Sequence, residues 1–308
     1  MKKFTSGPMR QRRAVGNLHI QRRILPILAV AAGLLTASNA SAVILNFTDV
    51  TPPPGTPGYN GEGTINDAVY RAIDTHPAGT GVFQPFLTYQ NKGIESGYNT
   101  SEGGNGQGFL DTKRVPKWNH DLHVSDLAST TLPGHGATTY YAFELDANET
   151  GSGNINRILS IDQIRIFTSP NNTAATVQEN VAAIDANGLG TLQYEMNAAG
   201  TSGPNWVLID ASNSEGGSTS GSGSSDLIVY VPTTLFDDAG RNDFVYFYTI
   251  NGVHDAAAPG SRSDAGFEEW RALLGPTAVP DGGSTLLLLG SALIPLGLLR
   301  ARRESKKA

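Results

Sequence analysis

The chain has 308 residues, no cysteine and a net charge of −6 at pH 7. Without cysteine it has no disulfide, no thiolate metal site and no thiol nucleophile. Seven of the 22 Lys and Arg residues precede Val43 and five follow Leu299, which leaves ten between Val43 and Gly275 against 26 Asp and Glu. This central part therefore has a net charge near −16. Such an acidic segment argues against nucleic acid as a partner, because phosphates require a basic face.

Residues 1–42 have the three parts of a secretory signal peptide. Basic residues lead into an apolar run at 24–35, and Ala40-Ser41-Ala42 places small residues where signal peptidase cuts. The predicted cleavage follows Ala42 and makes Val43 the first residue of the exported protein.

The central part is dominated by the signals of β-strands. Short runs of alternating apolar, β-branched and aromatic residues are separated by Gly, Asn, Ser and Pro. The pattern within 159–167 is imperfect, which indicates a strand that passes from an exposed to a covered environment. Seven strands are predicted, at 43–48, 81–89, 139–146, 159–167, 205–211, 226–232 and 243–250.

Two stretches favour helices. Residues 172–184 contain helix formers. Residues 264–275 have Asp264 as a potential N-cap, apolar residues on one face and Gly275 as a stop.

The polar loops at 51–63 and 212–226 are too short to divide the central part into two domains. The second loop fits a hairpin tip or an insert. The sequence therefore predicts an all-β protein with one domain at 43–275. We expect a single β-sandwich, jelly-roll or lectin-like, with long loops.

Residues 146–157 share part of the pattern of an EF-hand calcium loop. Asp146 and Asn148 occupy the first and third ligand positions, but the twelfth position, which needs a bidentate Glu, holds Arg157. A standard EF-hand is therefore excluded. A plain hairpin loop without a cofactor is the favoured interpretation, and a looser Ca²⁺ site built from Asp146, Asn148 and Glu149 with backbone carbonyls is the alternative.

His120 and His123, with Asp121 and Asp126, form another group of metal-ligating side chains. In an extended strand, residues three apart point to opposite faces. The two imidazoles would then diverge, so we expect polar strand positions here and no shared ion.

No catalytic motif is recognisable, and we expect the protein not to be an enzyme. The nearest match to a serine nucleophile elbow has Thr219 at its centre. Asp237-Asp238 and Glu268-Glu269 are adjacent pairs, whereas glycosidase carboxylates face each other across about 5–9 Å.

Strand tyrosines could stack on sugar rings, but ordinary packing of a half-buried surface is the favoured interpretation. The candidates for such stacking are Tyr140, Tyr141, Tyr246 and Tyr248.

Residues 276–308 consist of a motif, an apolar run and a basic end. The motif is Val279-Pro280-Asp281-Gly282-Gly283, and the run covers 284–299. The run is shorter than the ~20 residues of a spanning helix, so a buried core helix is the alternative. The basic end predicts a transmembrane helix with a stop-transfer flank at 300–308, formed by Arg300, Arg302, Arg303, Lys306 and Lys307.

This order of parts resembles a PEP-CTERM-type sorting signal, in particular its VPDSG-CTERM variant, from which Gly282 and Gly283 depart slightly. The resemblance implies recognition and cutting by an exosortase, a membrane-embedded transpeptidase-like enzyme of bacteria with an outer membrane. It implies a precursor anchored in the inner membrane and then delivery to the cell surface or extracellular matrix. Expected partners are signal peptidase, exosortase, the membrane before processing, and extracellular polysaccharide.

Five stretches of the central part are similar to uncharacterised exported bacterial proteins with such tails: 79–100, 118–127, 159–167, 221–232 and 265–270. That similarity implies one secreted domain and no mechanism. The sequence therefore predicts an exported structural or interaction protein. The alternatives are a calcium-assisted carbohydrate-binding module of lectin type and a secreted hydrolase.

Overall fold

The computed structural model describes most of the segment between the two predicted targeting signals. The described residues are 41–49, 60–72, 83–102, 109–113, 115–149, 157–200, 203–211, 225–259, 261–264 and 266–275. The predicted sorting signal at 276–308 and residues 1–40 of the predicted signal peptide lie outside them. Within these ranges, no helix is long and apolar enough to cross a membrane.

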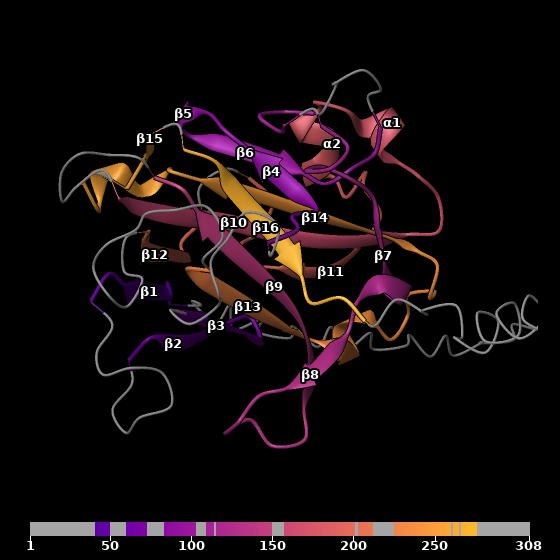
Figure 1. Ribbon diagram of the computed structural model, residues 1–308, viewed down its shortest axis with the longest axis horizontal. Helices are drawn as coiled ribbons and strands as arrows, with labels where there is room; N and C mark the ends of the chain where they lie inside the picture. The colour runs from indigo at the N-terminus through magenta and orange to yellow at the C-terminus, as the bar shows by residue number, and fades with distance from the viewer. Residues whose placement is uncertain are drawn as a thin grey trace, which may run out of the picture. The chain divides into compact units, whose positions relative to one another are not determined.

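Two seven-stranded sheets contain nearly all of the described strands (Figure 1). Sheet A has the order β1-β12-β10-β14-β6, with β11 on β10 and β7 on β14. Its pairings are antiparallel except that of β1 with β12. The strands are β1 (Ile44–Phe47), β6 (Glu95–Tyr98), β7 (Leu122–His123), β10 (Ile158–Ser169), β11 (Thr191–Glu195), β12 (Trp206–Asp210) and β14 (Phe244–Asn251).

Sheet B has the order β2-β3-β13-β9-β16-β4, with β8 on β9, and is antiparallel throughout. Its strands are β2 (Glu62–Ile65), β3 (Ala68–Ala72), β4 (Leu87–Tyr89), β8 (Ser129–Thr131), β9 (Thr139–Ala147), β13 (Leu227–Pro232) and β16 (Glu268–Ala272).

The remaining described elements are short. A two-stranded sheet joins β5 (Lys92–Gly93) to β15 (Ser263–Asp264). The helices are α1 (Ala174–Val177), α2 (Val181–Asp185) and the 3₁₀ turns η1 (Val124–Asp126), η2 (Thr233–Phe236) and η3 (His254–Ala256). The described chain is therefore all-β, as predicted.

Side chains of the two sheets share one hydrophobic core. The ring of Phe247 on β14 lies 5.1 Å from that of Phe143 on β9 and 4.6 Å from that of Trp270 on β16, between ring centroids. All three rings are fully buried. Along β9, Phe143 and Leu145 belong to this core, and the period of two places Glu144 on the opposite face.

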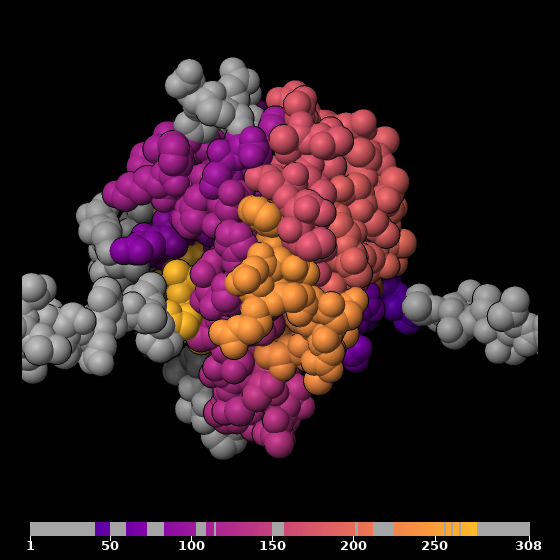
Figure 2. Space-filling view, turned by 90° about the vertical axis from the view of Figure 1, so that its right-hand side faces the viewer, coloured from indigo at the N-terminus to yellow at the C-terminus, as the bar shows by residue number. Residues whose placement is uncertain are grey.

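The other face of sheet A is covered by the segment that contains α1 and α2. Tyr246 and Tyr248 of β14 lie in a second cluster with Val177 and Ile184 of the two helices, and Tyr98 donates a hydrogen bond from its hydroxyl to the carbonyl of Gln178. Figure 2 shows this segment, in salmon, beside the purple segment that contains β6. The middle strands of sheet A are therefore buried on both faces.

This double cover and a bulge explain the imperfect pattern of 159–167. The register of β10 against β14 shifts between Ile161 and Gln163, so Asp162 is an extra residue. Because of this shift, the residues that face the main core are odd-numbered before Asp162 and even-numbered after it. Ile161 and Ile164 therefore both point into this core, although they are three residues apart.

Six of the seven predicted strands are confirmed, as β1, β9, β10, β12, β13 and β14. In the described part of the stretch predicted at 81–89, only Leu87–Tyr89 forms a strand, β4. The predicted helix at 172–184 is two short helices, because Gln178 between them has a φ of 50°. Several short strands were not predicted. One signal for them was present: Asn66 and Asp67, both at positive φ, form the two-residue turn between β2 and β3.

The prediction of a helix at 264–275 is wrong. Residues 268–272 form β16, which pairs with β9 on one side and β4 on the other. Glu268, Trp270 and Ala272 are buried, whereas Glu269 and Arg271 are half-buried. Pairing on both sides overrides a local preference for helix, which is a weak effect.

The prediction that 146–157 forms a plain hairpin loop is also wrong. β9 belongs to sheet B and β10 to sheet A, so the segment between them crosses from one sheet to the other. The loop at 212–226 likewise joins β12 of sheet A to β13 of sheet B and is no hairpin tip.

Candidate functional site

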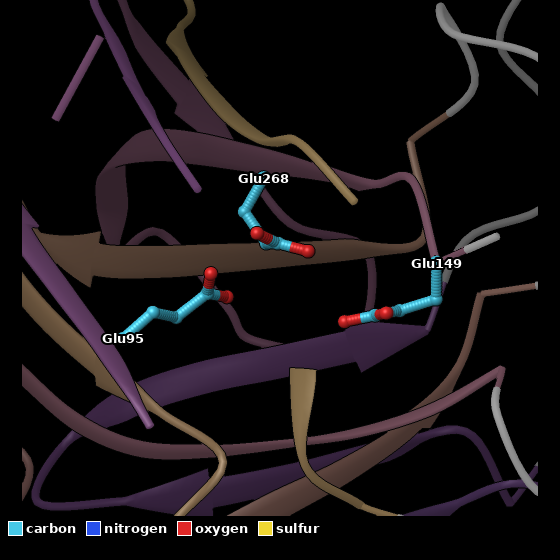
Figure 3. A group of neighbouring side chains, drawn as sticks. All are labelled: Glu95, Glu149 and Glu268. Carbon is cyan, nitrogen blue, oxygen red and sulfur yellow. The ribbon is translucent and has the colours of Figure 1, made fainter. Parts of the chain in front are cut away.

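Three glutamates from separate parts of the chain meet at the ends of their strands. Glu95 begins β6 of sheet A, Glu268 begins β16 of sheet B, and Glu149 follows the end of β9. One carboxylate oxygen of each lies within 4.8 Å of the others. Figure 3 shows the three side chains pointing toward one another. We call these residues the carboxylate cluster.

Strand pairing and one close backbone contact position the cluster. Glu268 lies opposite Ala147 of β9, and its side chain points inward on the same face of β16 as that of Trp270. Next to it, Gly266 packs so tightly that an added Cβ would lie 1.7 Å from the carbonyl oxygen of Asn148. A glycine is therefore required where the segment leading into β16 meets the segment that carries Glu149.

The cluster is buried and poor in hydrogen-bond donors. Glu95, Glu149 and Glu268 are 0%, 4% and 0% exposed. Glu95 accepts from the backbone N–H of Asn91 (3.1 Å), and Glu149 accepts from that of Asp264 (2.7 Å). Among the described residues, both carboxylate oxygens of Glu268 and Oε1 of Glu149 have no hydrogen-bond partner.

The described surroundings of the cluster are hydrogen-bonded to one another and supply no cationic partner. The hydroxyl of Tyr89 accepts from Asn251 Nδ2 (2.7 Å) and Trp270 Nε1 (3.0 Å), both buried side chains. In the part of the chain that the structure describes, no Lys, Arg or His forms an ion pair with a cluster carboxylate. The negative charges of the cluster are therefore uncompensated by cationic side chains from these regions.

Burial and mutual repulsion favour the protonated forms. Burial raises the pKa of Glu95 to about 7 and raises that of Glu149. It raises the pKa of Glu268 well above its usual range, and the charges of Glu95 and Glu149 add to this effect. Without a bound cation, the cluster at neutral pH is therefore stabilised by protons.

This predicts an unusual pH dependence for the protein in EDTA. A carboxyl whose pKa is raised on folding binds its proton more tightly in the folded state, so stability falls as pH rises from the unfolded pKa to the folded one. For Glu95 the window is pH 4.5 to about 7. We expect the free energy of unfolding, measured with urea, to fall by on the order of 3 kcal/mol across this pH window.

The control for this prediction is Glu95→Gln, which removes the titrating group. In this variant the free energy of unfolding should fall much less over the same pH window. The other titrating carboxyls of the cluster are Glu149 and Glu268, and the pKa of the neighbouring Tyr89 is raised well above its usual range by burial. An equally steep decline in Glu95→Gln would contradict the assignment.

The structure separates the three residues of the predicted calcium site. Glu149 points into the carboxylate cluster, but Asn148 donates from Nδ2 to the carbonyl of Phe267 (3.0 Å). Asp146 lies on the other face of β9 from Ala147, near Asp226, whose pKa is raised by burial and also by the charge of Asp146. The structure therefore does not direct the side chains of Asp146, Asn148 and Glu149 to one point, and Arg157 pairs with Asp210 (3.0 Å).

His120 and His123 do not belong to the carboxylate cluster. His123 packs on the ring of Phe244, with the ring centroids 4.6 Å apart, and its Nδ1 lies 3.5 Å from Asp126. Burial lowers the pKa of His120.

Another buried carboxylate, that of Asp162, lies at the bulge of β10. Its Oδ1 is 2.5 Å from Nδ1 of His254, whose ring stacks on Trp206, and its Oδ2 accepts from the hydroxyl of Ser160 (2.9 Å). Ser160 thus donates to the carboxylate and not to the imidazole. This arrangement lacks the serine–histidine contact of an acyl-transfer triad.

The other chemical candidates are placed as follows. Asp237 and Asp238 are both exposed, and Glu269 points away from the cluster that contains Glu268. The tyrosines considered for sugar stacking pack inside the protein: Tyr140, Tyr246 and Tyr248 are buried and Tyr141 packs on Phe236. The sorting motif Val279–Gly283, the basic tail and Ala40 lie outside the described residues.

Comparison with protein-family models, curated proteins and solved structures found no match for this chain. The site is therefore interpreted from its own geometry.

Proposed function

We propose that the protein is an exported structural or interaction protein of a bacterium with an outer membrane. In this proposal residues 1–42 are removed by signal peptidase, an exosortase processes the sorting signal at 276–308, and the body at 43–275 reaches the cell surface or exopolysaccharide matrix. The membrane holds the precursor through 284–299 until it is cut.

The position of the last strand is the observation that carries this proposal. β16 is an inner strand of sheet B, and the backbone N–H of Gly275 donates to the carbonyl of Asp126 (2.8 Å). Val279 follows only four residues later. A cut at the motif would therefore leave every strand of both sheets in place, as a sorting signal appended to a folded body requires.

The beginning of the body supports the same interpretation. Ser41 and Ala42 are exposed, and β1 starts at Ile44. The backbone nitrogen of Val43 donates to Asn205 Oδ1 (2.9 Å). Cleavage after Ala42 would leave β1 and this hydrogen bond intact.

We further propose that the body is a β-sandwich of jelly-roll or lectin-like type. The shared core of the two sheets, with Phe143 and Trp270 of sheet B against Phe247 of sheet A, supports face-to-face packing. The two alternative functions gain no support. Sugar stacking would need accessible tyrosines, and hydrolysis would need accessible carboxylates, whereas those of the cluster are at most 4% exposed.

Intact-mass analysis of the protein from its native producer tests the proposal. The expected mature form begins at Val43 and ends between Val279 and Gly283. Substituting Asp281→Ala should make the uncut precursor accumulate, whereas Thr277→Ser, between the body and the motif, should not. A wild-type form that retains Leu286–Ala308 would contradict exosortase processing.

A further inference from the structure

The carboxylate cluster presents a physical conflict that side chains of the described residues do not resolve. Three carboxylates share one buried site in which like charges repel, and a buried charge without a partner is strongly unfavourable. Two kinds of partner could resolve the conflict: protons or a bound cation. The position of Glu268 shows where such a partner would bind.

The donors closest to the cluster serve Glu95 and Glu149 but not Glu268. Asn251 Nδ2 donates to Tyr89 (2.7 Å) and, at 3.4 Å, to Oε1 of Glu95, and Ser263 hydrogen-bonds to Glu149. Trp270 Nε1 donates to Tyr89, and the hydroxyl of Ser263 donates to the carbonyl of Asn91 (2.9 Å). Glu268 is completely buried, yet in the described part of the chain neither of its oxygens has a hydrogen-bond partner. Both oxygens are therefore free to bind a ligand at the point toward which Glu95 and Glu149 also point (Figure 3).

We propose that Glu95, Glu149 and Glu268 bind one calcium ion. Carboxylate oxygen is a hard ligand, and a site that offers oxygen without imidazole or thiolate favours Ca²⁺ over Zn²⁺. Three carboxylates supply up to six oxygens, which suits the six to eight ligands of Ca²⁺. Mg²⁺ usually retains several waters, which a buried cluster accommodates poorly.

The ion would join parts of the fold that are distant in sequence. Glu95 belongs to sheet A, Glu268 to sheet B, and Glu149 to the segment that crosses from one sheet to the other. A bound Ca²⁺ would therefore cross-link the two sheets at one end of their shared core. This role does not depend on how the protein is sorted.

Calcium titration of the full chain, purified in detergent and freed of metal with EDTA, tests the proposal. Ligand at 100 times its Kd stabilises a protein enough to raise the Tm of a domain of this size by about 5–10 °C. We expect a saturable rise of this size with CaCl₂, one ion per chain by isothermal titration calorimetry, and a much smaller rise with MgCl₂.

Two variants connect the effect to the cluster. Glu268→Gln should abolish the calcium-dependent rise in Tm. Asp237→Asn/Asp238→Asn removes two exposed acidic residues away from the cluster and should retain the full rise.

The stability of Glu268→Gln without calcium shows whether this variant folds. In EDTA at pH 7.5 its Tm should equal or exceed that of wild type, because the amide cannot ionise at this buried position and can donate to Glu95 and Glu149. In CaCl₂ the order should reverse. An equal calcium response in wild type and Glu268→Gln, or none in wild type, would overturn the proposal and leave protons as the partners of the cluster.

Discussion

Deleting residues 264–275 from the chain will abolish cooperative unfolding, whereas ending the chain at Gly275 will leave the Tm within about 2 °C of that of the full-length protein. The first change removes β16, which is paired on both sides in sheet B. The second removes only residues that follow the described part of the chain and leaves every described strand in place.

The expected loss is large because β16 contributes to both the hydrogen bonding and the core of sheet B. Without it, β4 loses its only strand partner in that sheet among the described residues, and one side of β9 exposes unpaired backbone groups. The buried Trp270 is lost as well. Since a domain is stable by only about 5–15 kcal/mol, these losses together exceed what the fold can tolerate.

Differential scanning calorimetry measures both outcomes. A cooperative transition in the chain that lacks 264–275 would show that β16 is dispensable, and it would weaken the argument that the body closes just before the sorting motif. The result also bears on export, because a body that requires residues 264–275 cannot finish folding until nearly all of it has crossed the membrane.

The second large effect is expected for Trp270→Ala, which should lower the free energy of unfolding by about 3–5 kcal/mol and the Tm by about 6–20 °C. The indole is fully buried, packs on Phe247 and donates to the hydroxyl of Tyr89. Alanine would leave a cavity between the sheets and remove one donor from Tyr89.

Two controls separate burial from hydrogen bonding. Trp118→Ala removes an indole that is 38% exposed and should cost about 1 kcal/mol or less. Trp270→Phe keeps most of the packing and loses the N–H donor, so its cost should be intermediate. If urea unfolding gives the same loss for Trp270→Ala and Trp118→Ala, the placement of Trp270 in the shared core is wrong.

Long strands with a clear local pattern were predictable. The stretches at 139–146 and 243–250 are rich in aromatic and β-branched residues, and both form strands. The wrong prediction of a helix at 264–275 has a physical cause. The same few residues fit a helix with one apolar face and a strand from which Glu268 and Trp270 point inward. Only the partners β9 and β4 decide between them.

The carboxylate cluster was not predictable from spacing. Sequence reasoning identified Glu149 but grouped it with Asp146 and Asn148, because neighbours in sequence are the only neighbours that a loop motif can use. Glu268 could have been identified only if 268–272 had been predicted as a strand. An acidic residue that points inward from a strand needs a partner, and this would have marked Glu268 as a candidate. Glu95 gave no comparable signal.

The sequence by itself determined the all-β character of the body, most of its long strands, and the separation of an acidic centre from basic ends. These properties follow from local composition and from the period of two along each strand. Tertiary structure alone decided that β16 is a strand, that Asp162 shifts the parity of β10, and that three buried glutamates share one site. Each of these depends on pairing between residues far apart in the chain, and local preferences are too weak to specify such pairing.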